Sequence, residues 1–197
     1  MKKIICIIIF LLIATPLFGQ STVIVAKKKA ASCTLIESPI QTTYTSDASL
    51  GNHTEGAQYL SIKFTAPSNL TLRTVVLVMS TDNNSPDQDV VVALCTDSGG
   101  APNVCTNADA VMSSPGVAGY KYMRWSAGYA ITSSSVYHIR VSTAQDSNTH
   151  YYKLRYNNNV SGASLLKSAD GSSWSNYGGD SSAQGLFELS ECVTYVH

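Results

Sequence analysis

The sequence predicts an all-β protein, a single jelly roll or β-sandwich of antiparallel strands stapled by disulfide bonds. Three observations predict it. Apolar and polar residues alternate in many short segments, clusters of Gly, Pro, Asn and Asp separate these segments, and an even number of cysteines follows an apolar N-terminal stretch. No segment carries the sustained apolar stripe of an amphipathic helix. Short strands separated by frequent turns are typical of sandwiches and barrels.

The N-terminus has the pattern of a secretory signal peptide. Lys2 and Lys3 are followed by an apolar run over residues 4–14, which is shorter than the roughly 20 residues that span a bilayer. We therefore predict a signal peptide over residues 1–19, an N-terminal leader or extension over 20–31 and a β-sandwich domain over 32–197. The alternative is a retained apolar segment that anchors the protein or takes part in assembly. After cleavage we expect no membrane span and a secreted or cell-surface protein.

The charge balance argues against nucleic-acid binding. The chain has 13 basic and 13 acidic residues, and no basic stripe is present that would neutralise phosphates. Its length is sufficient for one domain with a substantial core.

Four cysteines remain after the signal peptide, and in an exported protein they predict two disulfide bonds. We favour Cys95 with Cys105, because Gly and Pro residues between them form a turn, and Cys33 with Cys192, which would join the first strand to the last. A zinc site is the alternative, but the sequence has no Cys-x-x-Cys pair and its histidines are scattered.

The alternation assigns side chains to faces. Over residues 58–64, Leu60 and Ile62 share one face and Ser61 lies on the other, and residues 136–143 repeat the pattern with Ile139 inward. Trp125 alternates with Met123 and Lys121, and we predict that it packs in the core or at a strand edge. The other predicted strands are residues 72–79, 90–94, 120–125, 150–156, 164–167 and 186–190.

The order of features in the middle of the chain resembles the extracellular jelly-roll modules called choice-of-anchor domains. The matching features are a strand ending Phe-Thr-Ala-Pro at 64–67, the segment Leu-Thr-Leu-Arg-Thr-Val at 70–75, the strand at 91–94 that runs into Asp-Ser-Gly-Gly-Ala-Pro at 97–102, and the strand around Tyr137. The resemblance covers roughly residues 58–189. It implies a jelly roll and a surface location, and it implies no catalytic residue.

An acidic loop between two strong strands is a candidate calcium site. Asp82, Asn84, Asp87 and Asp89 offer the oxygen ligands that calcium prefers. A solvated polar turn is the alternative, and the spacing is not that of an EF-hand. We expect no other cofactor.

Aromatic residues offer a candidate glycan site. Trp174 lies in a polar, glycine-rich loop, and its candidate partners are Tyr177, Tyr151 and Arg155. The alternative is that Trp174 covers one end of the core.

The sequence has no nucleophile elbow, zinc-protease motif or phosphate loop, and we expect no enzyme activity. The favoured function is structural or adhesive, through binding of a surface partner or self-assembly. The alternative function is carbohydrate binding.

Overall fold

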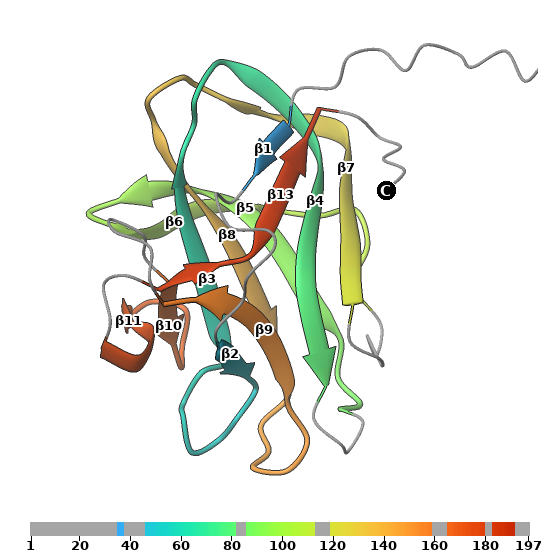
Figure 1. Ribbon diagram of the computed structural model, residues 1–197, viewed down its shortest axis with the longest axis vertical. Helices are drawn as coiled ribbons and strands as arrows, with labels where there is room; N and C mark the ends of the chain where they lie inside the picture. Colours follow the sequence, from blue (N-terminus) through green and yellow to red (C-terminus); the bar gives the residue numbers. More distant parts are fainter. Residues whose placement is uncertain are drawn as a thin grey trace, which may run out of the picture. The chain divides into compact units, whose positions relative to one another are not determined.

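The computed structural model describes residues 35–37, 46–81, 86–112, 119–158, 165–179 and 183–191 (Figure 1). All of them belong to one compact unit, Cys33–His197. Their strands form two antiparallel sheets packed as a sandwich, which confirms the predicted all-β fold class. The predicted signal peptide and leader lie outside the described residues, and the predicted domain boundaries stay predictions.

The seven-stranded sheet, sheet A, is built around the long strand β4 (Leu70–Thr81). One edge of β4 pairs with β7 (Gly119–Ile131), and the other pairs first with β13 (Phe187–Ser190) and then with β9 (Tyr152–Asn157). The remaining strands extend this arrangement: β1 (Leu35–Glu37) pairs with β13, while β2 (Ser46–Leu50) and β12 (Gln184–Gly185) pair with β9.

The six-stranded sheet, sheet B, has the order β11-β10-β3-β8-β5-β6. Its bounds are β11 Ser175–Asn176, β10 Leu165–Ser168, β3 Tyr59–Thr65, β8 Val136–Thr143, β5 Val90–Ser98 and β6 Ala101–Asn107. A short 3-10 turn, η1 (Tyr177–Gly179), follows β11. In Figure 1 the light-green β5–β6 hairpin extends toward the left of the view.

The core lies between the inner faces of the two sheets. Leu60 and Ile62 from β3 and Ile139 from β8 are completely buried there, as the alternation predicts. Trp125 of β7 is 2% exposed, and its indole N–H donates to the carbonyl of Thr106 at 3.1 Å. The prediction that Trp125 packs in the core is therefore confirmed.

The disulfide between Cys95 and Cys105 joins β5 to β6, with an S–S distance of 2.03 Å, and confirms the first predicted pairing. Cys33 and Cys192 lie outside the described residues, so the second pairing stays a prediction. Within the described part of the chain, no helix is long and apolar enough to cross a membrane.

Candidate binding surface

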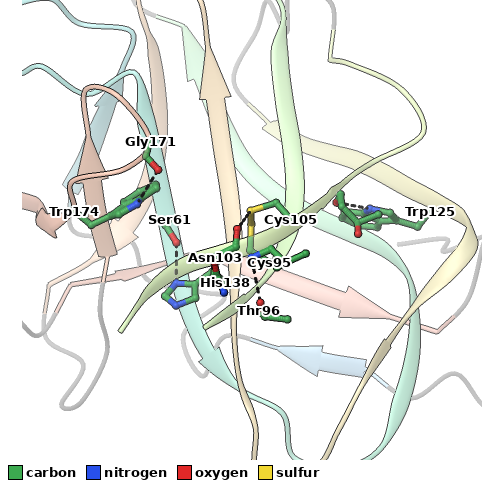
Figure 2. The surroundings of a disulfide bond; sticks show 11 residues. Ser61, Cys95, Thr96, Asn103, Cys105, Trp125, His138, Gly171 and Trp174 are labelled. Carbon is green, nitrogen blue, oxygen red and sulfur yellow. Dashed lines mark hydrogen bonds between the residues drawn. A yellow bond between two sulfur atoms is a disulfide. The ribbon is translucent and has the colours of Figure 1, made fainter. Parts of the chain in front are cut away.

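The outer face of sheet B carries a continuous set of polar and aromatic side chains. The ladder places Ser61 opposite Arg140, Lys63 opposite His138, and Cys95 opposite His138. These positions alternate with the buried core residues, so their side chains point away from the core. Figure 2 shows Ser61 and His138 beside the disulfide, with Trp174 beyond Ser61.

Ser61, His138 and Asp97 form a hydrogen-bonded chain on this face, beside the disulfide. This chain, the disulfide and the turn of the β5–β6 hairpin are here called the closed half of the surface. The hydroxyl of Ser61 lies 2.9 Å from Nδ1 of His138, and Nε2 of His138 lies 2.8 Å from Oδ1 of Asp97. Ser61 and His138 are both fully buried. Ser61 and His138 therefore contact the polar groups of their neighbours instead of solvent, while Asp97 remains partly exposed.

The environment lowers the pKa of both ionisable groups in this chain. Burial lowers the pKa of His138, and the hydrogen bond to Asp97 opposes this effect without cancelling it. Burial would raise the pKa of Asp97, but hydrogen bonds from His138 and from the backbone N–H of Gly100 outweigh it and lower this pKa. At neutral pH, His138 is thus neutral and Asp97 is ionised.

The three residue types are those of a hydrolase triad, but their arrangement differs from one. In such triads the serine bonds Nε2 and the carboxylate bonds Nδ1 of the histidine, whereas here the two ring nitrogens are exchanged. Ser61 has no exposed surface, so no substrate can reach its hydroxyl in this structure. The geometry suits a structural network.

Trp174, Tyr59 and Arg140 form the open half of the surface. The Trp174 and Tyr59 rings meet edge-on, with centroids 6.4 Å apart, and the guanidinium carbon of Arg140 lies 5.9 Å from the Tyr59 centroid. All three residues are half-buried. The Arg140 guanidinium has no hydrogen bond or ion pair with any described residue, and its Nε is buried without a partner.

The loop that carries Trp174 is folded against Tyr59. The Asp170 carboxylate accepts hydrogen bonds from the backbone N–H groups of Ser172 at 2.8 Å and Ser173 at 2.9 Å, and these bonds lower the pKa of Asp170. Gly171 has a φ of +76°, and a Cβ there would lie 3.2 Å from the Tyr59 ring. The Trp174 indole N–H donates to the Gly171 carbonyl at 3.2 Å. The Trp174 ring is thereby held in place beside Tyr59.

The other predicted glycan residues have different surroundings. Tyr177 is buried, donates its hydroxyl to Glu55 and accepts the backbone N–H of Ser49, and its pKa is raised by burial and by Glu55. Tyr151 lies under the ammonium of Lys153, and Arg155 belongs to β9 of sheet A. Trp174 instead contacts Tyr59 and Gly171, which are not among the glycan-binding residues predicted from the sequence.

The predicted calcium site lies partly outside the described residues, because Asp82 and Asn84 are not among them. Asp87 and Asp89 are described, and their backbone groups bond Gln145 and Thr143. Among the described residues, no group of three or more His, Cys, Asp or Glu side chains could hold a metal ion. Calcium binding stays a prediction.

A second aromatic surface lies along β7. Tyr120 is 54% exposed and Tyr122 is 42% exposed, and both line an open groove of about 450 Å³ between β7 and residues 109–112. The alternation that buries Met123 and Trp125 places these tyrosines on the opposite face. That pattern could have predicted their exposure.

Comparisons with known proteins do not identify the chain. No family model matches it, and no curated protein matches it. The resemblance to choice-of-anchor domains stays a prediction from sequence motifs, and the function has to be argued from the residues themselves.

Proposed function

We propose that this protein is a secreted or cell-surface adhesive β-sandwich that binds a glycan with the outer face of sheet B and does not act by catalysis. The observation that carries the proposal is the open half of this surface. It combines two half-buried rings with a guanidinium that packs on one of them but forms no hydrogen bond or ion pair with any described residue. A buried polar group without a hydrogen-bond partner favours the binding of a ligand that supplies the missing hydrogen bonds.

The chemistry of the open half matches that of a sugar. One face of a pyranose ring presents C–H groups, which pack on aromatic rings such as Tyr59 and Trp174. The hydroxyl groups around the sugar accept hydrogen bonds from a guanidinium such as Arg140. The hydrogen bonds of the 168–174 loop hold Trp174 in position before a ligand arrives, which lowers the entropic cost of binding.

The disulfide bond supports a location outside the cytosol. Structural disulfides persist in oxidising compartments, and Cys95–Cys105 joins two paired strands. The apolar N-terminal pattern adds to this argument. The complete burial of Ser61 and His138 argues against catalysis by this pair, because no substrate can reach the serine hydroxyl.

A glycan array tests the proposal. The protein is expected to bind a subset of glycans, and Trp174→Ala is expected to reduce this binding at least tenfold. Tyr122→Ala, which removes an exposed ring from the groove along β7, is the matched control and should bind normally. If Tyr122→Ala abolishes binding while Trp174→Ala does not, the ligand site is the groove and not sheet B.

Self-assembly is the second candidate function, and the open edge of β6 favours it. Among the described strands, β6 pairs only with β5, and it contains no charged residue. The Ala108 N–H donates to the Val92 carbonyl, so Ala108 directs its backbone groups toward β5. Hydrogen-bonded and non-hydrogen-bonded pairs alternate along an antiparallel ladder, so the backbone N–H and C=O groups of Cys105 and Asn107 point away from β5. Val104 on this strand is 67% exposed. Natural edges are commonly protected by charge, and this edge has none.

Sedimentation of the protein over a range of concentrations tests self-assembly. Dimers or larger species are expected at high concentration, and Val104→Lys should shift them toward monomers, because a charged side chain on an edge strand opposes pairing with a second chain. Val111→Lys, at an exposed valine in the segment that follows β6, is the matched control. A protein that remains monomeric at every concentration would rule out this second function.

A further inference from the structure

We infer that the ligand of the sheet B surface is an acidic saccharide, whose carboxylate pairs with Arg140 while its rings pack on Tyr59 and Trp174. The inference rests on the proposed glycan binding and adds the chemical class of the ligand. It follows from the balance of charges on this face, from the geometry of the guanidinium and from the order of the strands.

The charge of Arg140 is not neutralised by the carboxylates of the same face. Asp97 accepts hydrogen bonds from His138 at 2.8 Å and from the backbone N–H of Gly100 at 3.2 Å. Asp170 accepts bonds from Ser168, Ser172 and Ser173 within its own loop. Both carboxylates therefore have partners of their own, and neither forms an ion pair with Arg140.

A second cation, Lys63, lies on the same face. It is half-buried on β3, directly opposite His138 and diagonal to Arg140 across the β3–β8 pair. Diagonal neighbours on paired strands lie roughly 7–8 Å apart, within reach of long side chains. The Lys63 ammonium has no hydrogen bond or ion pair with a described residue, although its charge is felt by His138 and Asp97. This face therefore presents two cations whose charges are available to an anion.

The geometry of Arg140 favours a carboxylate. A guanidinium is a planar fork of donors that matches the two oxygens of a carboxylate, and such paired bonds are stronger than neutral hydrogen bonds. The stem of Arg140 is half-buried against Tyr59, which limits the orientations of the fork. Partial burial also strengthens the interaction with an anion, because solvent screens it less.

The order of the strands indicates how such a ligand would lie. Trp174 is beside β10 and β11, Tyr59 is on β3 and Arg140 is on β8, so the three side chains follow one another across the sheet. Adjacent strands are 4.7–4.9 Å apart, so the distance from β10 to β8 is roughly 10 Å. A short oligosaccharide that crosses the strands would contact both rings and reach the cation.

Isothermal titration calorimetry with matched oligosaccharides tests the inference. The probes are a uronic-acid oligosaccharide, the same oligosaccharide with its carboxyl groups reduced to alcohols, and a sulfated form of this neutral chain. The uronic acid is expected to bind at least tenfold more tightly than the neutral chain and more tightly than the sulfated one. Its affinity should fall as salt is added.

Variants connect the effect to named residues. Arg140→Met keeps the apolar stem and is expected to lower the affinity for the uronic acid at least tenfold, and that for the neutral chain, which loses only neutral hydrogen bonds, by a smaller factor. Lys63→Met should lower it two- to threefold. Lys121→Met, which removes a lysine at the groove along β7, is the control and should change nothing. The melting temperature of each variant verifies that it is folded.

The outcomes separate this inference from the proposed function. If the neutral and acidic chains bind equally, and Arg140→Met weakens both by the same factor, the acidic ligand class is wrong while glycan binding stands. Tighter binding of the sulfated chain would contradict the assignment to a carboxylate. If none of the saccharides binds and a wider glycan array is also negative, both the inference and the proposed function fail.

Discussion

The closed and open halves of the sheet B surface belong to the same face of the same sheet, yet their polar groups are in opposite states. Ser61, His138 and Asp97 each have a hydrogen-bond partner, and the histidine itself is fully buried. Around Arg140, a half-buried cation packs on a ring and has no polar partner among the described residues. The comparison teaches that satisfied polar groups stabilise the fold, whereas unsatisfied groups retain the capacity to bind.

The largest effect is expected from removing the disulfide of the closed half. The double variant Cys95→Ala with Cys105→Ala should lower the free energy of unfolding by about 3 kcal/mol, because the unfolded chain regains the freedom of the short loop. Denaturant unfolding measures this change. The double variant is preferable to a reducing agent, which would also act on any bond between Cys33 and Cys192. An unchanged unfolding midpoint would show that the disulfide does not stabilise this half.

The second prediction contrasts the two halves directly. His138→Ala should cost about 2–3 kcal/mol of stability, because it leaves buried Ser61 and partly buried Asp97 without their partner. Arg140→Ala should cost less than about 1 kcal/mol, because its charge is not paired within the protein. Denaturant unfolding of the two variants gives the comparison. Equal losses would mean that the halves do not differ in the way described.

The third prediction uses one glycine from each half. Gly171→Ala in the Trp174 loop should cost about 1–2 kcal/mol, because its φ of +76° disfavours a side chain and its Cβ would press on Tyr59. Gly99→Ala in the β5–β6 hairpin has a φ of +64° but no neighbour within 4 Å, so it should cost only about 1 kcal/mol. Tryptophan fluorescence should change for Gly171→Ala alone. A fluorescence change of similar size for Gly99→Ala would contradict this prediction.

The fourth and smallest effect concerns pH. Because burial lowers the pKa of His138, the folded protein binds fewer protons than the unfolded chain once the pH falls below about 6.5. Stability should therefore decrease as the pH falls through about 6.5, the ordinary pKa of histidine, which is above the range in which Asp97 titrates. Melting temperatures measure the decrease. In His138→Asn, the melting temperature should no longer fall with pH in this range. If it falls as in the unmodified protein, other titrating groups cause the decrease.

The sequence alone was sufficient to predict the sandwich and the inward faces of its strands. Leu60 and Ile139 are buried as their alternation predicts, and Cys95 bonds to Cys105 across a glycine turn. The whole of β6 is absent from the predicted strands, because Gly99, Gly100 and Pro102 indicate a turn in the loop between Cys95 and Cys105. The turn is shorter than predicted, and the strand already begins at Ala101.

The candidate surface could be predicted only in part. Trp174 was selected, but its partner Tyr59 was not, because alternation assigns a residue to a face without identifying the neighbouring strand. The burial of Ser61 and His138 on an outward face was unexpected for the same reason, since it depends on which side chains of adjacent strands lean over them. Such contacts between distant parts of the chain are decided by the tertiary fold.

The pairing of β4 has a consequence for the time at which the protein can fold. Residues 74–77 of this strand pair with β13, and among the described strands β1 pairs only with β13. Residues 35–37 and the part of the β4 edge at residues 74–77 therefore gain these partners only after residues 187–190 have been synthesised, whereas β7 and β9 can pair with β4 earlier. Because long-range pairings of this kind are slow to form, this part of the β4 edge stays uncovered until β13 has been synthesised and docked. A chaperone that holds this edge would protect the protein when it is most exposed to aggregation.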